Sequence, residues 1–135
     1  DSQGTLESPS RGQRRWRTQL KPADGLLLEA AEKFNRASGS VAVVSAASTY
    51  HCGGGFTTGG RHALEEALCT QTTLFESIEL AQSSQLKGMK SHGHQPYIPV
   101  DGVVLSPNVE VIRGGTDTGY RFLDEPWKLA AVISL

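Results

Sequence analysis

Cysteine is scarce in this sequence, and its scarcity excludes several kinds of protein. The only two cysteines, Cys52 and Cys69, are not spaced as a zinc-binding pair or as a redox motif. Two cysteines in 135 residues are also too few for a small secreted protein held together by disulfides. The first residues are too polar for a secretory signal peptide. We therefore expect a reducing intracellular environment, either the cytoplasm or the nucleus.

Long apolar runs and an excess of one charge are also missing. No stretch approaches the ~20 consecutive apolar residues that a membrane-spanning helix requires, so we expect no membrane partner. The formal net charge of −1 gives the whole chain no attraction for nucleic acid, and we expect no direct nucleic-acid binding. Positive charge gathers only near the N-terminus, at Arg11, Arg14, Arg15 and Arg17. We therefore divide the chain into a flexible basic arm, residues 1–22, and one folded domain, residues 23–135.

The common nucleotide-binding and metal-binding motifs are absent as well. No Lys-Ser or Lys-Thr pair opens the helix expected after Gly60, as a nucleotide P-loop requires, and Thr58 stands where a dinucleotide-binding motif needs glycine. The histidines do not have the spacing of a metal motif such as HExxH; they are His51, His62, His92 and His94. We therefore expect neither an ATPase nor an NAD enzyme, and neither a metal nor a cofactor.

What the sequence does contain is an organised stretch at residues 41–82. It begins with a β-branched apolar run, 41–45, which predicts a short strand buried on both faces. Three glycines, 53–55, follow and allow the backbone to approach a ligand with its N–H groups turned outward. After Gly60 the spacing becomes helical, with one apolar face formed by Leu64, Leu68, Phe75 and Ile78. A strand, a glycine loop and a helix N-terminus in this order are typical of a phosphate-binding site.

The segments around this stretch predict further helical and irregular structure. We expect a helix over 25–37, with Asp24 as its N-cap. Its core-facing stripe would consist of Leu27, Leu28, Ala31 and Phe34. The polar segments 83–96 and 117–126 lack periodicity and are predicted to be loops.

Three apolar runs in the second half predict strands. The runs 102–105 and 109–112 are separated by Pro107, which cannot donate to a strand ladder and therefore indicates a turn or a sheet edge rather than one continuous central strand. The last run, 129–135, is typical of a central parallel strand. Alternating helices and strands of this kind predict an α/β fold.

The glycine loop and the helix after it carry a resemblance to a known family. Gly53-Gly54-Gly55, eight residues and then Leu64-Glu65-Glu66 resemble the signature of poly(ADP-ribose) glycohydrolases, which is three glycines, six to eight residues and Gln-Glu-Glu. Further segments are similar to the microbial-type branch of that family in the same order, namely Phe56, Leu68-Cys69, Thr73-Leu74-Phe75, the run 106–113 and the final strand. The resemblance extends from about residue 25 to residue 135.

The resemblance implies a macrodomain-like three-layer sandwich, with helices on both faces of a mixed central sheet. It also implies a cleft above the strand ends that binds ADP-ribose, or poly(ADP-ribose) on modified proteins, without a cofactor. In this family a second phosphate-binding loop follows the strand that here ends at Leu135. We therefore expect the chain to be the N-terminal portion of the domain, with the C-terminal part missing.

The same resemblance implies a role for each site residue. Glu66 would be the general acid that cleaves the ribose–ribose bond, and Glu65 would orient the ribose hydroxyls. The ligand-binding residues would be Gly53, Gly54, Gly55, Phe56, Ser45 and Ser48, with the glycine loop holding the diphosphate. Neighbours on a helix point ~100° apart, so the two glutamates cannot face one bond as an opposed pair. A general acid at neutral pH needs a raised pKa, which burial beside a second carboxylate would supply for Glu66.

Two other interpretations remain open. Leu64 stands where the motif has glutamine, and residues 45–52 contain no asparagine, although the family usually places one there to contact the distal ribose. These departures are compatible with a module that binds ADP-ribose without cleaving it. A third possibility is an inactive fragment whose arginine-rich arm belongs to a neighbouring partner-binding region.

Overall fold

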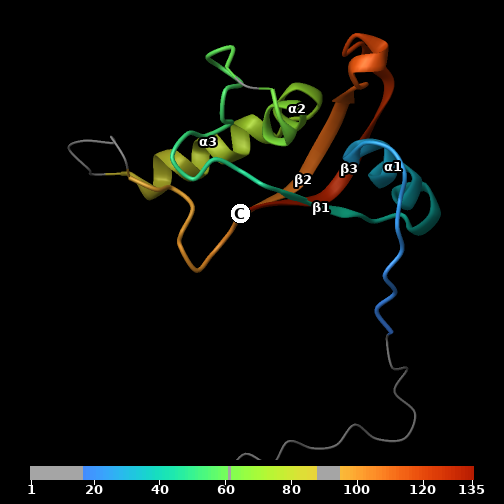
Figure 1. Cartoon of the computed structure of the whole chain (residues 1–135), viewed down its shortest axis with the longest axis horizontal. Coiled ribbons are helices and arrows are strands. Elements are labelled where there is room, and N and C mark those ends of the chain that lie inside the picture. The colour runs from blue at the N-terminus through green and yellow to red at the C-terminus, as the bar shows by residue number, and fades with distance from the viewer. Residues whose placement is uncertain (1–16, 61, 88–94) are drawn as a thin grey trace, which may run out of the picture.

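The computed structural model describes residues 17–60, 62–87 and 95–135 (Figure 1). Its helices are α1 (Leu27–Ser38), α2 (Leu64–Gln71) and α3 (Leu74–Gln85), with a short 3-10 turn η1 (Thr116–Thr118). Its strands are β1 (Ala42–Ser45), β2 (Val104–Arg113) and β3 (Phe122–Ser134). They form one mixed sheet in the order β1-β3-β2, in which β3 runs parallel to β1 and antiparallel to β2. The predicted α/β class, mixed sheet and central last strand are confirmed.

One hydrophobic core joins the helices to a single face of the sheet. It is built from Leu28, Ala31, Val43, Leu68, Cys69, Leu74, Ile78, Val109, Val111, Leu129 and Val132. The opposite face carries a cross-strand row of Val44, Ile133 and Leu105, in which Val44 and Leu105 are exposed. Of the three layers expected, the described residues therefore supply the sheet and one helical layer.

Strand β1 differs from its prediction in its burial. Val43 and Ser45 are buried, whereas Ala42 and Val44 point to the open face of the sheet. An apolar run cannot distinguish a strand covered on both faces from one covered on one face only. The expectation of burial on both faces is therefore wrong for the described structure.

Helix α1 begins two residues later than predicted. Asp24 is not the N-cap; Leu26 is, and its N–H donates to the Glu29 carboxylate over 3.0 Å. The helix ends at Gly39, whose φ of 76° is the left-handed conformation that glycine adopts readily. Phe34, predicted to face the core, is exposed.

The single helix predicted after the glycine loop is two helices. Thr72 has extended backbone and forms an isolated antiparallel bridge with Val111 of β2. Next to it, the Thr73 N–H donates to the Glu110 carbonyl and the Glu110 N–H donates to the Thr73 hydroxyl, each over 3.0 Å. These bonds to β2 interrupt the helix and fix the end of α2 against the sheet.

Strand β2 is continuous through Pro107, contrary to the prediction of two separate runs. Pro107 pairs with Ala131, and Asn108 after it has a φ of 54°. The proline is tolerated because β2 is an edge strand in the described sheet, as the sequence indicated. The segment 117–126 is also more ordered than predicted, since β3 begins at Phe122.

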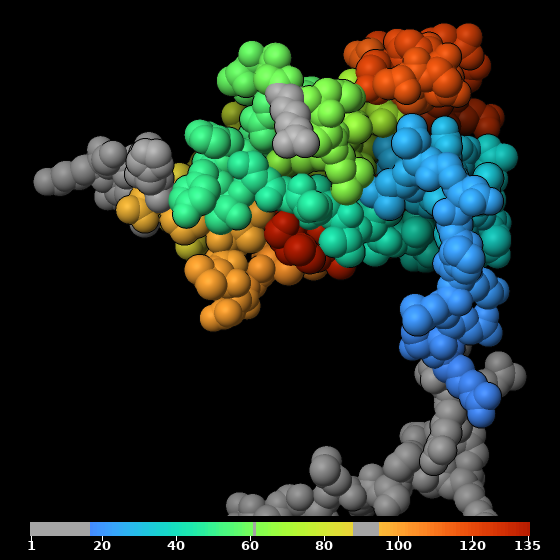
Figure 2. All heavy atoms as spheres, viewed as in Figure 1, coloured from blue at the N-terminus to red at the C-terminus, as the bar shows by residue number. Residues whose placement is uncertain are grey.

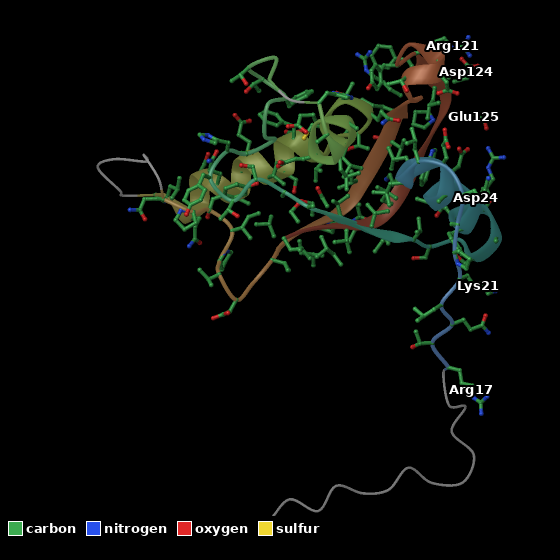
Figure 3. All side chains as sticks on the ribbon, in the orientation of Figure 1. Arg17, Lys21, Asp24, Arg121, Asp124 and Glu125 are labelled. Atoms are coloured by element: carbon green, nitrogen blue, oxygen red, sulfur yellow. The ribbon has the colours of Figure 1, made fainter. Side chains whose placement is uncertain are left out.

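The predicted basic arm is described only in part. Residues 17–24 are exposed and run away from the folded body (Figure 2). The side chains of Arg17, Lys21 and Asp24 follow this segment, whereas Arg121, Asp124 and Glu125 lie at the far end of the hairpin that β2 and β3 form (Figure 3). Arg11, Arg14 and Arg15 lie outside the described residues, and so do His92 and His94 of the predicted loop.

Candidate active site

Two adjacent glutamates occupy the first turn of α2 and are both buried. Glu65 is 4 % exposed and Glu66 is 8 % exposed. Ionisable side chains are rarely buried to this extent unless specific partners hold them. The partners come from the glycine loop and from the segment that follows β1.

Glu65 is held by two backbone N–H groups from the segment that follows β1. The Ser48 N–H donates to Oε2 over 2.8 Å, and the Gly53 N–H donates to Oε1 over 3.0 Å. Burial is the larger influence and raises the pKa of Glu65, while these two N–H groups act against it and the neighbouring Glu66 acts with it. The side chain is therefore fixed in place with its affinity for a proton increased.

Glu66 also accepts two backbone N–H groups, but its pKa is lowered rather than raised. The Gly55 N–H donates to Oε1 and the Ala63 N–H donates to Oε2, each over 2.9 Å. The Gly55 bond is the main reason why the pKa of Glu66 is lowered, and it outweighs the effect of burial. The expectation of a raised pKa for Glu66 is therefore wrong for this structure, in which the raised pKa belongs to Glu65.

The glycine loop lies directly over the two carboxylates. Gly54 has a φ of 57°, and a Cβ atom there would collide with Oε1 of Glu66 and lie 3.2 Å from Oε2 of Glu65. At Gly53 a Cβ atom would lie 2.9 Å from the ring of Phe75. Glycine at these positions is what allows the backbone to approach the glutamates.

The N–H groups of this loop do not point outward, as the sequence had suggested. Those of Gly53 and Gly55 bind the glutamates, that of Gly54 donates to the His51 carbonyl over 2.8 Å, and that of Phe56 donates to the Gly53 carbonyl over 3.0 Å. All four have partners within the chain. In this conformation the loop holds the two carboxylates in place. An anion that binds to these N–H groups would have to replace one or more of the hydrogen bonds they now make within the chain.

The structure brings Ser48 and Phe56 to the site but not Ser45. The Ser48 N–H holds Glu65, and its hydroxyl accepts the His51 N–H over 3.2 Å. Phe56 is partly exposed, with its ring centroid 5.1 Å from that of Phe75. Ser45 is completely buried in β1, so its side chain does not reach the surface of the described structure.

Two aromatic residues near the site were not recognised from the sequence. The Tyr120 hydroxyl lies 2.6 Å from Nε2 of His62, which joins the turn between β2 and β3 to the residue before Ala63. Tyr97 is buried beside the segment that follows β1. The only signal for Tyr97 was an aromatic and an aliphatic residue side by side at the end of a polar loop.

A cavity of about 420 Å³ lies between α1, α2 and the turn after β2. Its lining is mostly apolar and includes Leu26, Leu64 and Leu68, with His62 and Tyr120 among the polar members. Leu64 lines this cavity, whereas neither glutamate does. The position that departs from the family motif is therefore on a different side of α2 from the carboxylates.

The described residues contain no group of three or more His, Cys, Asp or Glu side chains placed to hold a metal ion. Within the same part of the chain, every helix is too short or too polar to cross a membrane.

Comparisons with known proteins agree on one family. The model of the family described as microbial-type PARG, catalytic domain, matches residues 5–114, where PARG stands for poly(ADP-ribose) glycohydrolase. The chain is similar to the crystal structure of poly(ADP-ribose) glycohydrolase from Thermomonospora curvata bound to the inhibitor ADP-HPD, with 34 % identity and a TM-score of 0.62. That match covers 79 % of this chain and 38 % of the other.

A second similar structure is that of poly(ADP-ribose) glycohydrolase from Deinococcus radiodurans in complex with ADP-ribose. It is 26 % identical with a TM-score of 0.61, and the match covers 80 % of this chain and 41 % of the other. The chain thus spans less than half the length of these solved structures. No curated protein matches it.

Proposed function

Because the chain belongs to the microbial-type poly(ADP-ribose) glycohydrolase catalytic domain family, we propose that it hydrolyses the O-glycosidic ribose–ribose bonds of poly(ADP-ribose). The observation that carries this proposal is the burial of two adjacent carboxylates beneath a glycine loop whose N–H groups hold both of them. Such a site can keep water away from a glycosidic bond and present it with a carboxyl group in a set orientation.

The two glutamates have separate roles in this proposal. Glu66 donates a proton to the leaving ribose oxygen, and Glu65 accepts hydrogen bonds from the ribose hydroxyls and orients the sugar. Both Glu65 oxygens already accept one N–H each, and a carboxylate oxygen has a second lone pair for a ribose hydroxyl. Phe56, exposed beside Phe75, offers an apolar surface on which the sugar can pack.

Ligand binding would also lead Glu66 to take up, from solvent, the proton that it later donates. The Gly55 N–H is the main reason why the pKa of Glu66 is lowered. We propose that the diphosphate of the ligand takes over this N–H. Glu66 then loses a donor to its charged form and gains a negative neighbour, and both changes raise its pKa.

The test of the function is the release of ADP-ribose from poly(ADP-ribose) by the full chain, followed by chromatography, with ADP-ribose binding measured by calorimetry on the same preparation. Release of ADP-ribose is the expected result. Binding without release would favour the alternative, an ADP-ribose-binding module without hydrolytic activity. Neither binding nor release would contradict both functions.

If the diphosphate replaces Glu66 as the acceptor of the Gly55 N–H, ligand binding should be accompanied by proton uptake. Because the ligand raises the pKa of Glu66, ADP-ribose binding should take up about one proton at pH values between the free and bound pKa, and affinity should rise as pH falls. Calorimetry in two buffers of different ionisation enthalpy measures the uptake. Glu66→Gln should abolish it, and binding by the unaltered chain without any uptake would contradict the exchange.

Leu64→Gln, which restores the family motif, should change the hydrolysis rate by less than about threefold. The reason is that Leu64 lines the cavity against α1 and contributes no atom to the hydrogen bonds of either glutamate. Leu26→Gln is the matched control, since Leu26 lines the same cavity outside the motif. An increase of a hundredfold or more in Leu64→Gln alone would mean that leucine disables the site.

A further inference from the structure

Tyr97 is one of the largest completely buried side chains, yet its hydroxyl has no hydrogen-bond partner among the described residues. The residue is 1 % exposed. Its N–H donates to the Thr49 carbonyl over 3.0 Å, immediately next to Ser48, whose own N–H donates to Glu65. The backbone of Tyr97 is thus attached to the segment that positions Glu65.

Among the groups whose charge acts on the Tyr97 hydroxyl, Glu65 is the one strong acceptor. Burial raises the pKa of Tyr97, and the nearby charge of Glu65 raises it further, so the hydroxyl keeps its proton and can only donate to a carboxylate. The thiols of Cys52 and Cys69 face the same group, but burial raises the pKa of each to about 12 and both remain neutral, weak acceptors. The charge of Glu66 acts in turn on Glu65 and raises its pKa.

An unpaired buried hydroxyl is costly to a folded protein, because it gives up hydrogen bonds to water without replacing them. Phenylalanine would fill the same space without that cost. Within the described residues, packing therefore accounts for the ring of Tyr97 but leaves its hydroxyl available to a partner.

We propose that Tyr97 is a positioning residue whose hydroxyl donates to the Glu65 carboxylate when ligand occupies the site. This inference rests on the proposed function. Gly53 and Gly55 belong to one short loop, and their N–H groups hold Glu65 and Glu66 respectively. In this proposal the loop movement that gives the Gly55 N–H to the diphosphate also withdraws the Gly53 N–H from Glu65. Tyr97 then supplies the replacement donor, so that Glu65 stays ionised and able to accept the ribose hydroxyls.

The test follows the Glu65 carboxyl by NMR titration of the ¹³C-labelled full chain, with and without saturating ADP-ribose. In Tyr97→Phe with ADP-ribose, the midpoint of the Glu65 titration should lie about one pH unit higher than in the unaltered chain, because a donor to the charged form is lost. Without ligand the two midpoints should coincide, and thermal unfolding should show that Tyr97→Phe is as stable or more stable. Tyr50→Phe, at an exposed tyrosine of the same segment, should match the unaltered chain throughout.

Three outcomes separate the inference from the function on which it rests. Coincident midpoints in the presence of bound ADP-ribose would overturn the role of Tyr97 and leave the function intact. If Tyr97→Phe is less stable than the unaltered chain and loses hydrolysis only in proportion to its unfolded fraction, the residue serves packing and the inference is overturned. Absence of ADP-ribose binding by the unaltered chain would overturn the function, and this inference with it.

Discussion

Glu66→Gln should lower the rate of ADP-ribose release by about a thousandfold, within the range that general acid catalysis contributes. Glutamine has almost the same shape but no proton to give to the leaving ribose oxygen. Its amide oxygen can accept only one of the two N–H groups, from Gly55 and Ala63, that the carboxylate accepts. ADP-ribose affinity should fall much less than the rate, since the proposed contacts of Glu65 and Phe56 remain. Release assays and calorimetry on one preparation measure both quantities.

Glu76→Gln is the control for this experiment. Glu76 is an exposed acidic residue in the first turn of α3, where it makes the same change in charge one helix away from the site. Its variant should keep the rate of the unaltered chain. Equal rates in Glu66→Gln and the unaltered chain would remove Glu66 from the role of acid and leave Glu65, whose pKa is raised, as the group to test next.

Gly54→Ala should both destabilise the protein and abolish hydrolysis. The added Cβ atom meets Oε1 of Glu66 and approaches Oε2 of Glu65, in a residue whose φ of 57° already disfavours alanine. The loop must then lift from α2, which breaks the Gly53 and Gly55 bonds to the carboxylates. We expect a loss of about 3 kcal/mol in the free energy of unfolding, from backbone strain and lost charge-assisted bonds together. Chemical denaturation measures this loss.

A variant at a second glycine of the same loop separates the effect of backbone strain from that of the collision with the glutamates. Gly59 has a φ of 71°, and nothing lies within 4 Å of a Cβ atom built there. Gly59→Ala should therefore show the strain alone, about 1 kcal/mol, with hydrolysis retained. Equal losses of stability and activity in the two variants would show that contact between the loop and the glutamates is unimportant.

Residue type and spacing predicted the position of the glutamates but not their environment. Glu65 and Glu66 follow the glycine loop at the start of a helix, and the helical period places them in its first turn. The direction of the loop N–H groups could not be predicted, because glycine adopts both signs of φ with similar ease and only contact with α2 selects one arrangement. The reversed order of the two pKa values follows from the same contacts.

Long-range pairing accounts for most of the other differences. Leu68 and Phe75 keep helical spacing across Thr72, so the spacing alone does not show that β2 interrupts the helix there. Pro107 was read correctly as an edge signal, but a strand that needs no outer partner can continue through it. Tyr97 is buried next to Thr49, whose carbonyl accepts its N–H and which is distant in the sequence.

The bridge between Thr72 and Val111 also determines how movement can reach the site. Helix α2 has eight residues, so it is about 12 Å long and stiff on that scale. Its far end is fastened to β2 at Thr72 and Thr73, and its near end carries the glutamates. A displacement of β2 would therefore move α2 as a rigid body and carry the carboxylates with it. The glycine loop, in contrast, can change its conformation without moving β2. Any ligand of the proposed site would therefore have to be accommodated by the glycine loop rather than by α2.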